Sequence, residues 1–171
     1  VFEAFPKARE HIEQKPAEVP PLVFVQLLQA SQTPEDAISF CAYLLPRREA
    51  VWWACQCIRA MNTGLQAEAK RLLDIAEAWY NAPQEDNRKI ALDAGMESVT
   101  SGPAAWVALA AGWSGGSLTA EPLQPVPPAP HLTAQAVRAA VLTSLAVVPV
   151  KQRRERLVAA VQAVVRMVDP E

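Results

Sequence analysis

The sequence predicts an all-α fold, a compact bundle of about six to eight helices, on three observations. Apolar residues recur every three or four positions through most of the chain, which is the spacing of one helix face. Prolines and capping residues divide the chain into segments of ordinary helix length. Hydrophobic residues make up 51% of the 171 residues and charged residues 20%, which suffices for one sizeable core.

Four helices are expected in the first third of the chain. Residues 1–20 should form a short, loosely docked helix that ends at a run of prolines. A second helix begins at Pro21, since the leucines and glutamines that follow favour a helix over a buried strand. Thr33 is a candidate cap for the third helix, and Pro46 ends that helix and begins a fourth, which runs to Met61.

Three more helices are expected before a Pro-rich segment. Residues 65–81 are amphipathic, with leucines, alanines and Trp79 on one face and charged residues elsewhere. Pro83 begins a polar helix that ends near Gly95. Pro103 begins an apolar helix, which is expected to be buried.

The C-terminal third is predicted as a connector and a helical hairpin. In the connector, residues 118–132, prolines favour an extended, polyproline-like path: Pro122, Pro125, Pro127, Pro128 and Pro130. Thr133 is a candidate cap for the next helix, and a valine stripe after Pro149 predicts the last one. Residues 133–171 should pack back on the bundle of residues 1–117 and form one domain with it.

Composition argues against several classes of function. A formal net charge of −2 provides no basic field for nucleic acid. The longest apolar stretch, residues 103–113, is shorter than the about 20 residues of a transmembrane helix. Three cysteines form an odd set, which argues against a disulfide framework and for a reducing compartment, here the cytoplasm.

No catalytic, cofactor or metal site is predicted. Cys55 and Cys57 lie two positions apart, so on a helix their thiols point about 200° apart and cannot share one ion. We expect them to be small buried apolar residues. The two histidines, His11 and His131, leave few partners for a zinc site or a nucleophilic triad. We therefore expect no enzyme.

The helix after Pro46 carries two adjacent tryptophans, which point about 100° apart. Trp53 lies on an apolar flank and is expected to be buried. Trp52 lies on a polar line that we predict to be a protein interface, because tryptophan and arginine are enriched at binding hot spots. The other members of this candidate interface are Arg48, Gln56 and Arg59. The alternative is a Trp52 covered by the N-terminal residues or by the connector.

Arginines gather in the first turns of two predicted helices, where their charge opposes the helix dipole. The two groups are Arg47 with Arg48, and Arg153 with Arg154 and Arg156. Their acidic neighbours, Glu49 and Glu155, are expected to offset this cost. The alternative is an acidic partner surface.

A glycine-rich loop, Ser114, Gly115, Gly116 and Ser117, follows Trp113. It lacks the Lys-Ser/Thr and the preceding strand of a nucleotide-binding loop, so we interpret it as a helix exit into the Pro-rich segment. A backbone pocket that holds a small anion or the end of a partner's chain is the alternative.

Three sequence blocks occur in a fixed order: residues 45–55, then Ala105-Trp106 leading to residues 113–117, then Val126-Pro127-Pro128. In this order they resemble a bacterial family of unknown function. The resemblance implies a bacterial, cytoplasmic, non-enzymatic protein, with some relatives beside specialised secretion gene clusters. It assigns no functional residue.

The predicted function is a non-catalytic protein–protein interaction module: an adaptor, a chaperone or an assembly accessory whose partner is another protein. One alternative is a small-ligand-binding protein or an enzyme that uses the loop of residues 113–117. Another is a structural homo-oligomer in which the C-terminal helix pairs with its copy. No cofactor, nucleic acid or membrane span is expected.

Overall fold

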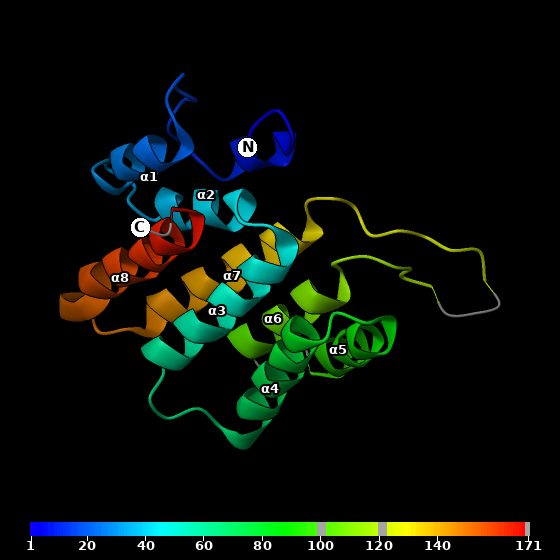
Figure 1. The fold of residues 1–171 in the computed structure, drawn as a ribbon. Coiled ribbons are helices and arrows are strands. Elements are labelled where there is room, and N and C mark those ends of the chain that lie inside the picture. Colours follow the sequence, from blue (N-terminus) through cyan, green and yellow to red (C-terminus); the bar gives the residue numbers. More distant parts are fainter. Residues whose placement is uncertain (99–101, 120–122, 170–171) are drawn as a thin grey trace.

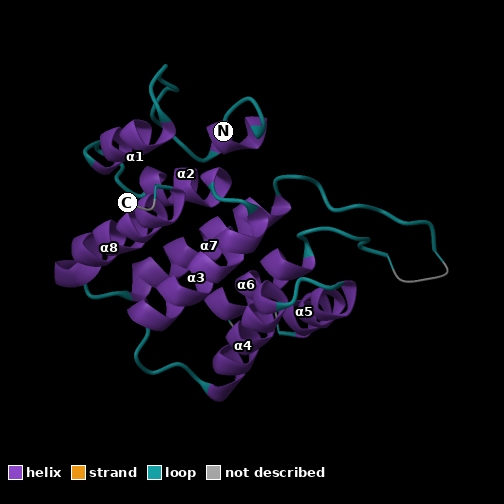
Figure 2. Ribbon diagram, viewed as in Figure 1, coloured by secondary structure: helices purple, strands orange, loops and turns teal. Residues whose placement is uncertain are grey.

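The computed structural model describes residues 1–98, 102–119 and 123–169. This part of the chain contains eight α-helices, one 3-10 helix and no strand, so the all-α prediction is confirmed (Figures 1 and 2). The elements are η1 (Pro6–Glu10), α1 (Pro21–Gln29), α2 (Asp36–Leu44), α3 (Arg47–Met61), α4 (Ala67–Asn81), α5 (Glu85–Glu97), α6 (Pro103–Gly112), α7 (Leu132–Val147) and α8 (Val150–Val168).

Helix α6 is enclosed by its neighbours. It packs against α3, α4, α5 and α7. Because it contains no charged residue, its burial on several sides leaves no charge unpaired in the core. Helix α7 packs in turn against α2, α3 and α6, and α8 packs against α1, α2, α3 and α7. The burial expected for the apolar helix after Pro103 is confirmed.

Trp53 joins α3 to the last helix. Its side chain is fully buried, as predicted, and its indole Nε1 donates a hydrogen bond to the carbonyl oxygen of Ala160 in α8, at 2.9 Å. A buried indole N–H needs such an acceptor, and the helix carbonyl provides it. Trp53 therefore fixes α8 on the bundle.

Two prolines separate consecutive helices in the same way. Pro46 and Pro149 each precede a helix, with φ of −54° and −51°, while Leu45 and Val148 before them are extended, with ψ of 142° and 137°. A residue before proline is driven out of the helical region, which ends α2 and α7 at these points. The predicted breaks at both prolines are confirmed.

The N-terminal segment is docked more firmly than predicted. Phe2 and Phe5 lie partly buried against the aromatic rings of α1 and α2, with ring centroids 5.6–5.9 Å apart. Asp36 at the start of α2 accepts hydrogen bonds from the backbone N–H of Glu13 and from Thr33 Oγ1. The Thr33 hydroxyl thus binds the carboxylate of Asp36, the first residue of α2. It does not bind a backbone N–H of the helix, so the predicted side-chain cap is not formed.

Thr133 was also expected to be a cap, and this prediction is wrong. Helix α7 already begins at Leu132, and Thr133 is buried within its first turn. Its hydroxyl donates to the carbonyl oxygen of Ala110 in α6, at 3.2 Å. The residue therefore joins α7 to α6.

Glycines allow α5 and α6 to approach closely. A Cβ on Gly112 would lie 2.6 Å from Leu92 Cα, and one on Gly95 would lie 2.8 Å from Leu109 Cγ. Each glycine thus faces a leucine of the opposite helix, and α5 and α6 pack more extensively than any other pair. Gly95 lies within α5, which extends past the predicted end to Glu97.

Between α6 and α7 the chain leaves the bundle as a projecting arm (Figure 1). We define the arm as two limbs, residues 117–119 and 123–130. The expected connector lies here, and its residues 120–122, including Pro122, fall outside the described part. The limbs are joined near their bases, where the Leu118 N–H donates to the carbonyl oxygen of Val126, at 2.8 Å.

Candidate interaction site at the projecting arm

The predicted interface on α3 runs along α4. Arg59 forms ion pairs with Asp74 (Nη2–Oδ1, 2.7 Å) and with Glu77 (Nε–Oε1, 3.0 Å), and Gln56 donates to the same carboxylate of Glu77. The hydrogen bonding of Arg59 to the Glu77 carboxylate, in which the guanidinium donates, is the main cause that raises the pKa of Arg59. These polar groups therefore already have partners within the chain.

Trp52 is partly buried, and α4 covers it. Its ring lies 6.0 Å from that of Tyr80, and Arg48 places its guanidinium 4.9 Å from the centroid of the same tyrosine. Arg48 Nε also donates to the Tyr80 carbonyl oxygen, at 2.7 Å. Helix α4, the next helix in the sequence, thus covers Trp52, whereas the alternative had expected the N-terminal residues or the connector to do so.

The arginines in first turns bind carbonyl oxygens, and the expectation of acidic neighbours as their partners is wrong at three of them. Arg48 binds Tyr80, as above. Arg153 Nη2 donates to the carbonyl oxygens of Ala146 and Val148 at the end of α7. Arg47 Nη1 donates to Ser114 O at 2.6 Å, and its Nη2 to Pro130 O at 3.3 Å. Arg47 thereby connects the glycine-rich loop, which precedes the arm, to the end of the arm at Pro130.

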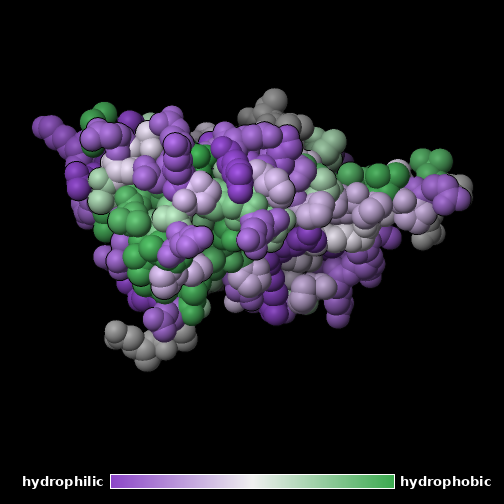
Figure 3. Space-filling model, turned by 90° about the horizontal axis from the view of Figure 1, so that it is seen from above, coloured by the Kyte–Doolittle hydropathy of each residue, from purple (hydrophilic) through white to green (hydrophobic). Residues whose placement is uncertain are grey.

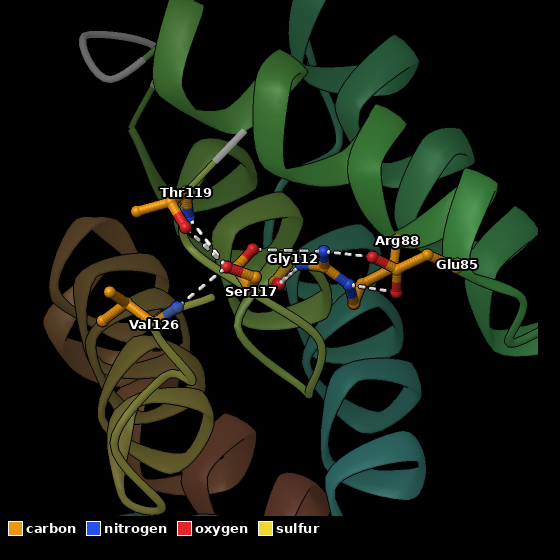
Figure 4. A network of polar contacts seen from close by, with 6 residues as sticks. All are labelled: Glu85, Arg88, Gly112, Ser117, Thr119 and Val126. Atoms are coloured by element: carbon orange, nitrogen blue, oxygen red, sulfur yellow. Dashed lines mark hydrogen bonds and ion pairs between the residues drawn. The ribbon is translucent and has the colours of Figure 1, made fainter. Parts of the chain in front are cut away.

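A second arginine holds the glycine-rich loop from the other side. Arg88 of α5 has only 5% of its side chain exposed and forms a bidentate pair with Glu85, both bonds at 2.7 Å (Figure 4). Two further N–H groups, on Nη1 and Nη2, donate to the carbonyl oxygens of Gly112 and Ser117. The hydrogen bonds between the pair lower the pKa of Glu85 and raise that of Arg88.

Gly116 makes room for this arginine. Its φ is +65°, a conformation that glycine adopts without the penalty of a side chain, and a Cβ there would lie 2.6 Å from Arg88 Nε. The loop was predicted from the sequence, whereas the role of Arg88 was not. The available signal was the spacing of Glu85 and Arg88, three apart on one helix face, which favours an ion pair.

The Ser117 hydroxyl organises the base of the arm (Figure 4). Its oxygen accepts the backbone N–H groups of Thr119 and Val126, at 3.1 and 3.0 Å, and lies 2.8 Å from Thr119 Oγ1. Thr119 Oγ1 donates to Gln124 O at 2.7 Å, so the Ser117 proton is the one shared between the two hydroxyls. The Ser117 hydroxyl thus donates one hydrogen bond and accepts two, and together with Thr119 it fixes both limbs at their bases.

Apolar side chains are displayed on this braced arm. Leu118, Leu123 and Val126 are 40%, 66% and 48% exposed, and hydrophobic atoms are visible on the projection in Figure 3. A cavity of about 430 Å³ lies between the arm and α5, lined by apolar residues such as Leu92 and by the charged Lys89 and Asp93. The site therefore combines exposed apolar groups with a hollow beside them.

The loop of Trp113, Ser114, Gly115, Gly116 and Ser117 lies at the base of the arm. Its carbonyl oxygens at Ser114 and Ser117 accept hydrogen bonds from Arg47 and Arg88, and the Ser117 hydroxyl binds the limbs of the arm. The cysteines lie elsewhere: Cys41, Cys55 and Cys57 are buried, and burial raises the pKa of the Cys57 thiol to about 12. Among the described residues, no three histidine, cysteine, aspartate or glutamate side chains are grouped so as to hold a metal.

None of the helices in the described part of the chain is both long and apolar enough to cross a membrane. Comparison with the curated proteins and with the solved structures gives no match. The model of one family, a family of unknown function designated DUF6931, matches residues 24–168. The expectation of an uncharacterised family is thereby confirmed, and the chain belongs to DUF6931.

Proposed function

We propose that the protein binds another protein through the projecting arm, as an adaptor, chaperone or assembly accessory without catalytic activity. The observation that carries the proposal is the display of Leu118, Leu123 and Val126 on a braced projection. Exposed apolar groups that are gathered on one feature are typical of interaction sites. The resemblance to a bacterial family suggests the setting, a bacterial cytoplasm beside a specialised secretion system.

The bracing supports the same proposal energetically. Arg47 and Arg88 bind four carbonyl oxygens at the base of the arm, and Ser117 closes the two limbs on each other. An arm that is ordered before binding loses less conformational entropy when a partner covers it. The line through Trp52 and Arg59 is the weaker candidate because α4 already satisfies its polar groups.

The experiment uses a photo-crosslinking residue at position 123 of the full chain. The matched control has the same residue at position 27, since Leu27 is also a half-exposed leucine and lies on α1. In extract of the source cells, we expect one protein to crosslink at position 123 and not at position 27. Equal labelling at both positions would indicate non-specific contact and would contradict the proposal.

A second measurement uses the partner that crosslinking identifies, purified in its free form. Leu123→Asp should weaken its binding about tenfold or more, because an apolar anchor of an interface is replaced by a charge. The far-UV circular dichroism should stay unchanged because Leu123 is 66% exposed. Unchanged affinity in a folded Leu123→Asp variant would show that the arm is not the interface. If Arg59→Ala weakened the binding instead, the candidate interface would be the α3 surface of Trp52 and Arg59.

A further inference from the structure

Charge is distributed unevenly between two helices at opposite sides of the fold. Helix α8 contains five basic residues and one acidic residue, a net charge of +4, within a chain whose net charge is −2. Helix α5 contains four acidic and two basic residues, a net charge of −2. In Figure 1, α8 lies at the left of the molecule and α5 at the right.

A groove of about 500 Å³ lies between α8 and the end of α1. Apolar side chains line it, among them Leu157, Val158 and Val150, of which Val150 is 77% exposed. Figure 3 shows hydrophobic side chains gathered on the side of the molecule where α1 and α8 lie. The groove thus offers apolar surface that this chain leaves open to solvent.

Two arginines give the groove its charge. Arg153 and Arg154 line it, together with one acidic residue, Glu35. The Nε of Arg153 is buried and finds no hydrogen-bond acceptor among the described residues, although its Nη2 binds the end of α7. Arg154 is exposed, so its guanidinium is the charge that a carboxylate of an occupant can reach.

Helix α5 carries the complementary surface. Its outer face displays Ile90 and Met96, which are 52% and 57% exposed. Asp86, Asp93 and Glu97 are exposed beside them, at the spacing of one helix face with Ile90, and Lys89 is the exposed cation of the same helix. The opposite face of α5 is fixed on α6 by Gly95, so the acidic and apolar face is presented by a rigid helix.

We propose that the chain associates head to tail, with α5 of one copy seated in the groove between α1 and α8 of the next copy. Seating an amphipathic helix in an apolar groove is a common mode of recognition, and here the acids of α5 meet the arginines of the groove. Each contact leaves one groove and one α5 free, so the geometry allows an open chain. This contact between copies goes beyond the proposed function, and it shares with the arm site only the edge of α5 at Lys89 and Asp93, which also line the cavity beside the arm.

Sedimentation velocity over a concentration series, at low and high salt, tests the proposal. We expect the mean mass to rise with concentration and the rise to weaken at high salt, because salt screens exposed charges. The groove variant is Val150→Asp with Arg154→Glu, and the helix variant is Asp93→Lys with Glu97→Lys. Each variant, measured by itself, should associate at least about tenfold more weakly than the wild type. Arg9→Glu, an exposed reversal on η1, should behave as wild type.

Mixing the two variants gives the sharpest result. The groove variant keeps an intact α5 and the helix variant keeps an intact groove, so the mixture should form a dimer and nothing larger. Circular dichroism of each variant checks the fold, and Arg154→Gln replaces the groove variant if that variant unfolds.

Three outcomes would overturn the proposal. The first is a wild-type protein that stays monomeric into the millimolar range. The second is a groove variant or helix variant that, measured by itself, assembles as the wild type does. Binding of a monomeric wild type to vesicles of anionic phospholipid, lost in the groove variant, would assign the groove to a lipid surface.

Discussion

The guanidinium of Arg88 and the backbone of Gly116 are in direct contact, with no space for a side chain between them. A Cβ at Gly116 would lie 2.6 Å from Nε and 2.7 Å from Cζ of Arg88. Gly116 also has a φ of +65°. A helix residue and a loop residue 28 positions apart in the sequence thereby determine how the arm leaves the bundle.

Gly116→Ala should lower the free energy of unfolding by about 1–2 kcal/mol, since an L-residue is strained at this φ, and the contact with Arg88 adds to the cost. The control is Gly115→Ala: no atom lies within 4 Å of a Cβ there and its φ is not positive. Urea denaturation of both variants measures the difference. Equal stability of the two variants would contradict the contact between Arg88 and the loop.

Arg88→Met should cost about 2–3 kcal/mol of stability, because it leaves the buried carbonyl oxygen of Gly112 without its charged donor and Glu85 without its partner. Glu85→Gln should cost less, about 1 kcal/mol, because that side chain is 49% exposed. Limited proteolysis should cut the arm faster in Arg88→Met than in Glu85→Gln. Identical cleavage rates would show that Arg88 does not brace the arm.

Helices were predictable from this sequence because apolar spacing and prolines are local signals. The position of Trp53 followed from its flank on α3, and the breaks followed from Pro46 and Pro149. The partners of polar residues were not predictable, because they depend on which helix packs where. Tyr80, which covers Trp52, is 28 residues away and carries no signal that it would face α3.

The candidate site shows the same limit. The sequence indicated the loop of residues 113–117 and the Pro-rich connector as separate features. It could not show that Arg47 would bind both Ser114 and Pro130, because that contact closes only when α3, α6 and α7 are assembled. The charge of a first-turn arginine suggested an acidic partner, whereas the fold supplies carbonyl oxygens.

The adjacent tryptophans should respond differently to the same substitution. Trp53→Phe should lower stability by about 1–3 kcal/mol, because it removes the hydrogen bond to Ala160 and leaves unfilled volume in a fully buried position. Trp52→Phe should cost less than about 1 kcal/mol, because the ring is partly exposed and phenylalanine can still lie against Tyr80. Thermal unfolding followed by circular dichroism compares the two, and a larger loss in Trp52→Phe would contradict the burial order.

His11 should make stability depend on pH. Its ring lies 6.3 Å from that of Tyr43, and its Nε2 lies 3.3 Å from the amide nitrogen of Gln135. Burial is the main cause that lowers the pKa of His11, and the positive charge of Arg138 on α7 lowers it further. The folded state therefore favours the neutral ring.

The sign of the effect follows from proton linkage. The unfolded chain binds a proton at His11 near the ordinary pKa of about 6.5, and the folded chain binds it only at lower pH. The free energy of unfolding should be unaffected by His11 above that pH, fall as the pH drops through 6.5, and level off below the folded-state pKa. Urea midpoints between about pH 5 and pH 8 measure the slope, and His11→Gln should flatten it. An equal slope in the variant would assign the pH dependence to other groups, and it would mean that protonation of His11 does not oppose docking of the N-terminal segment on α2 and α7.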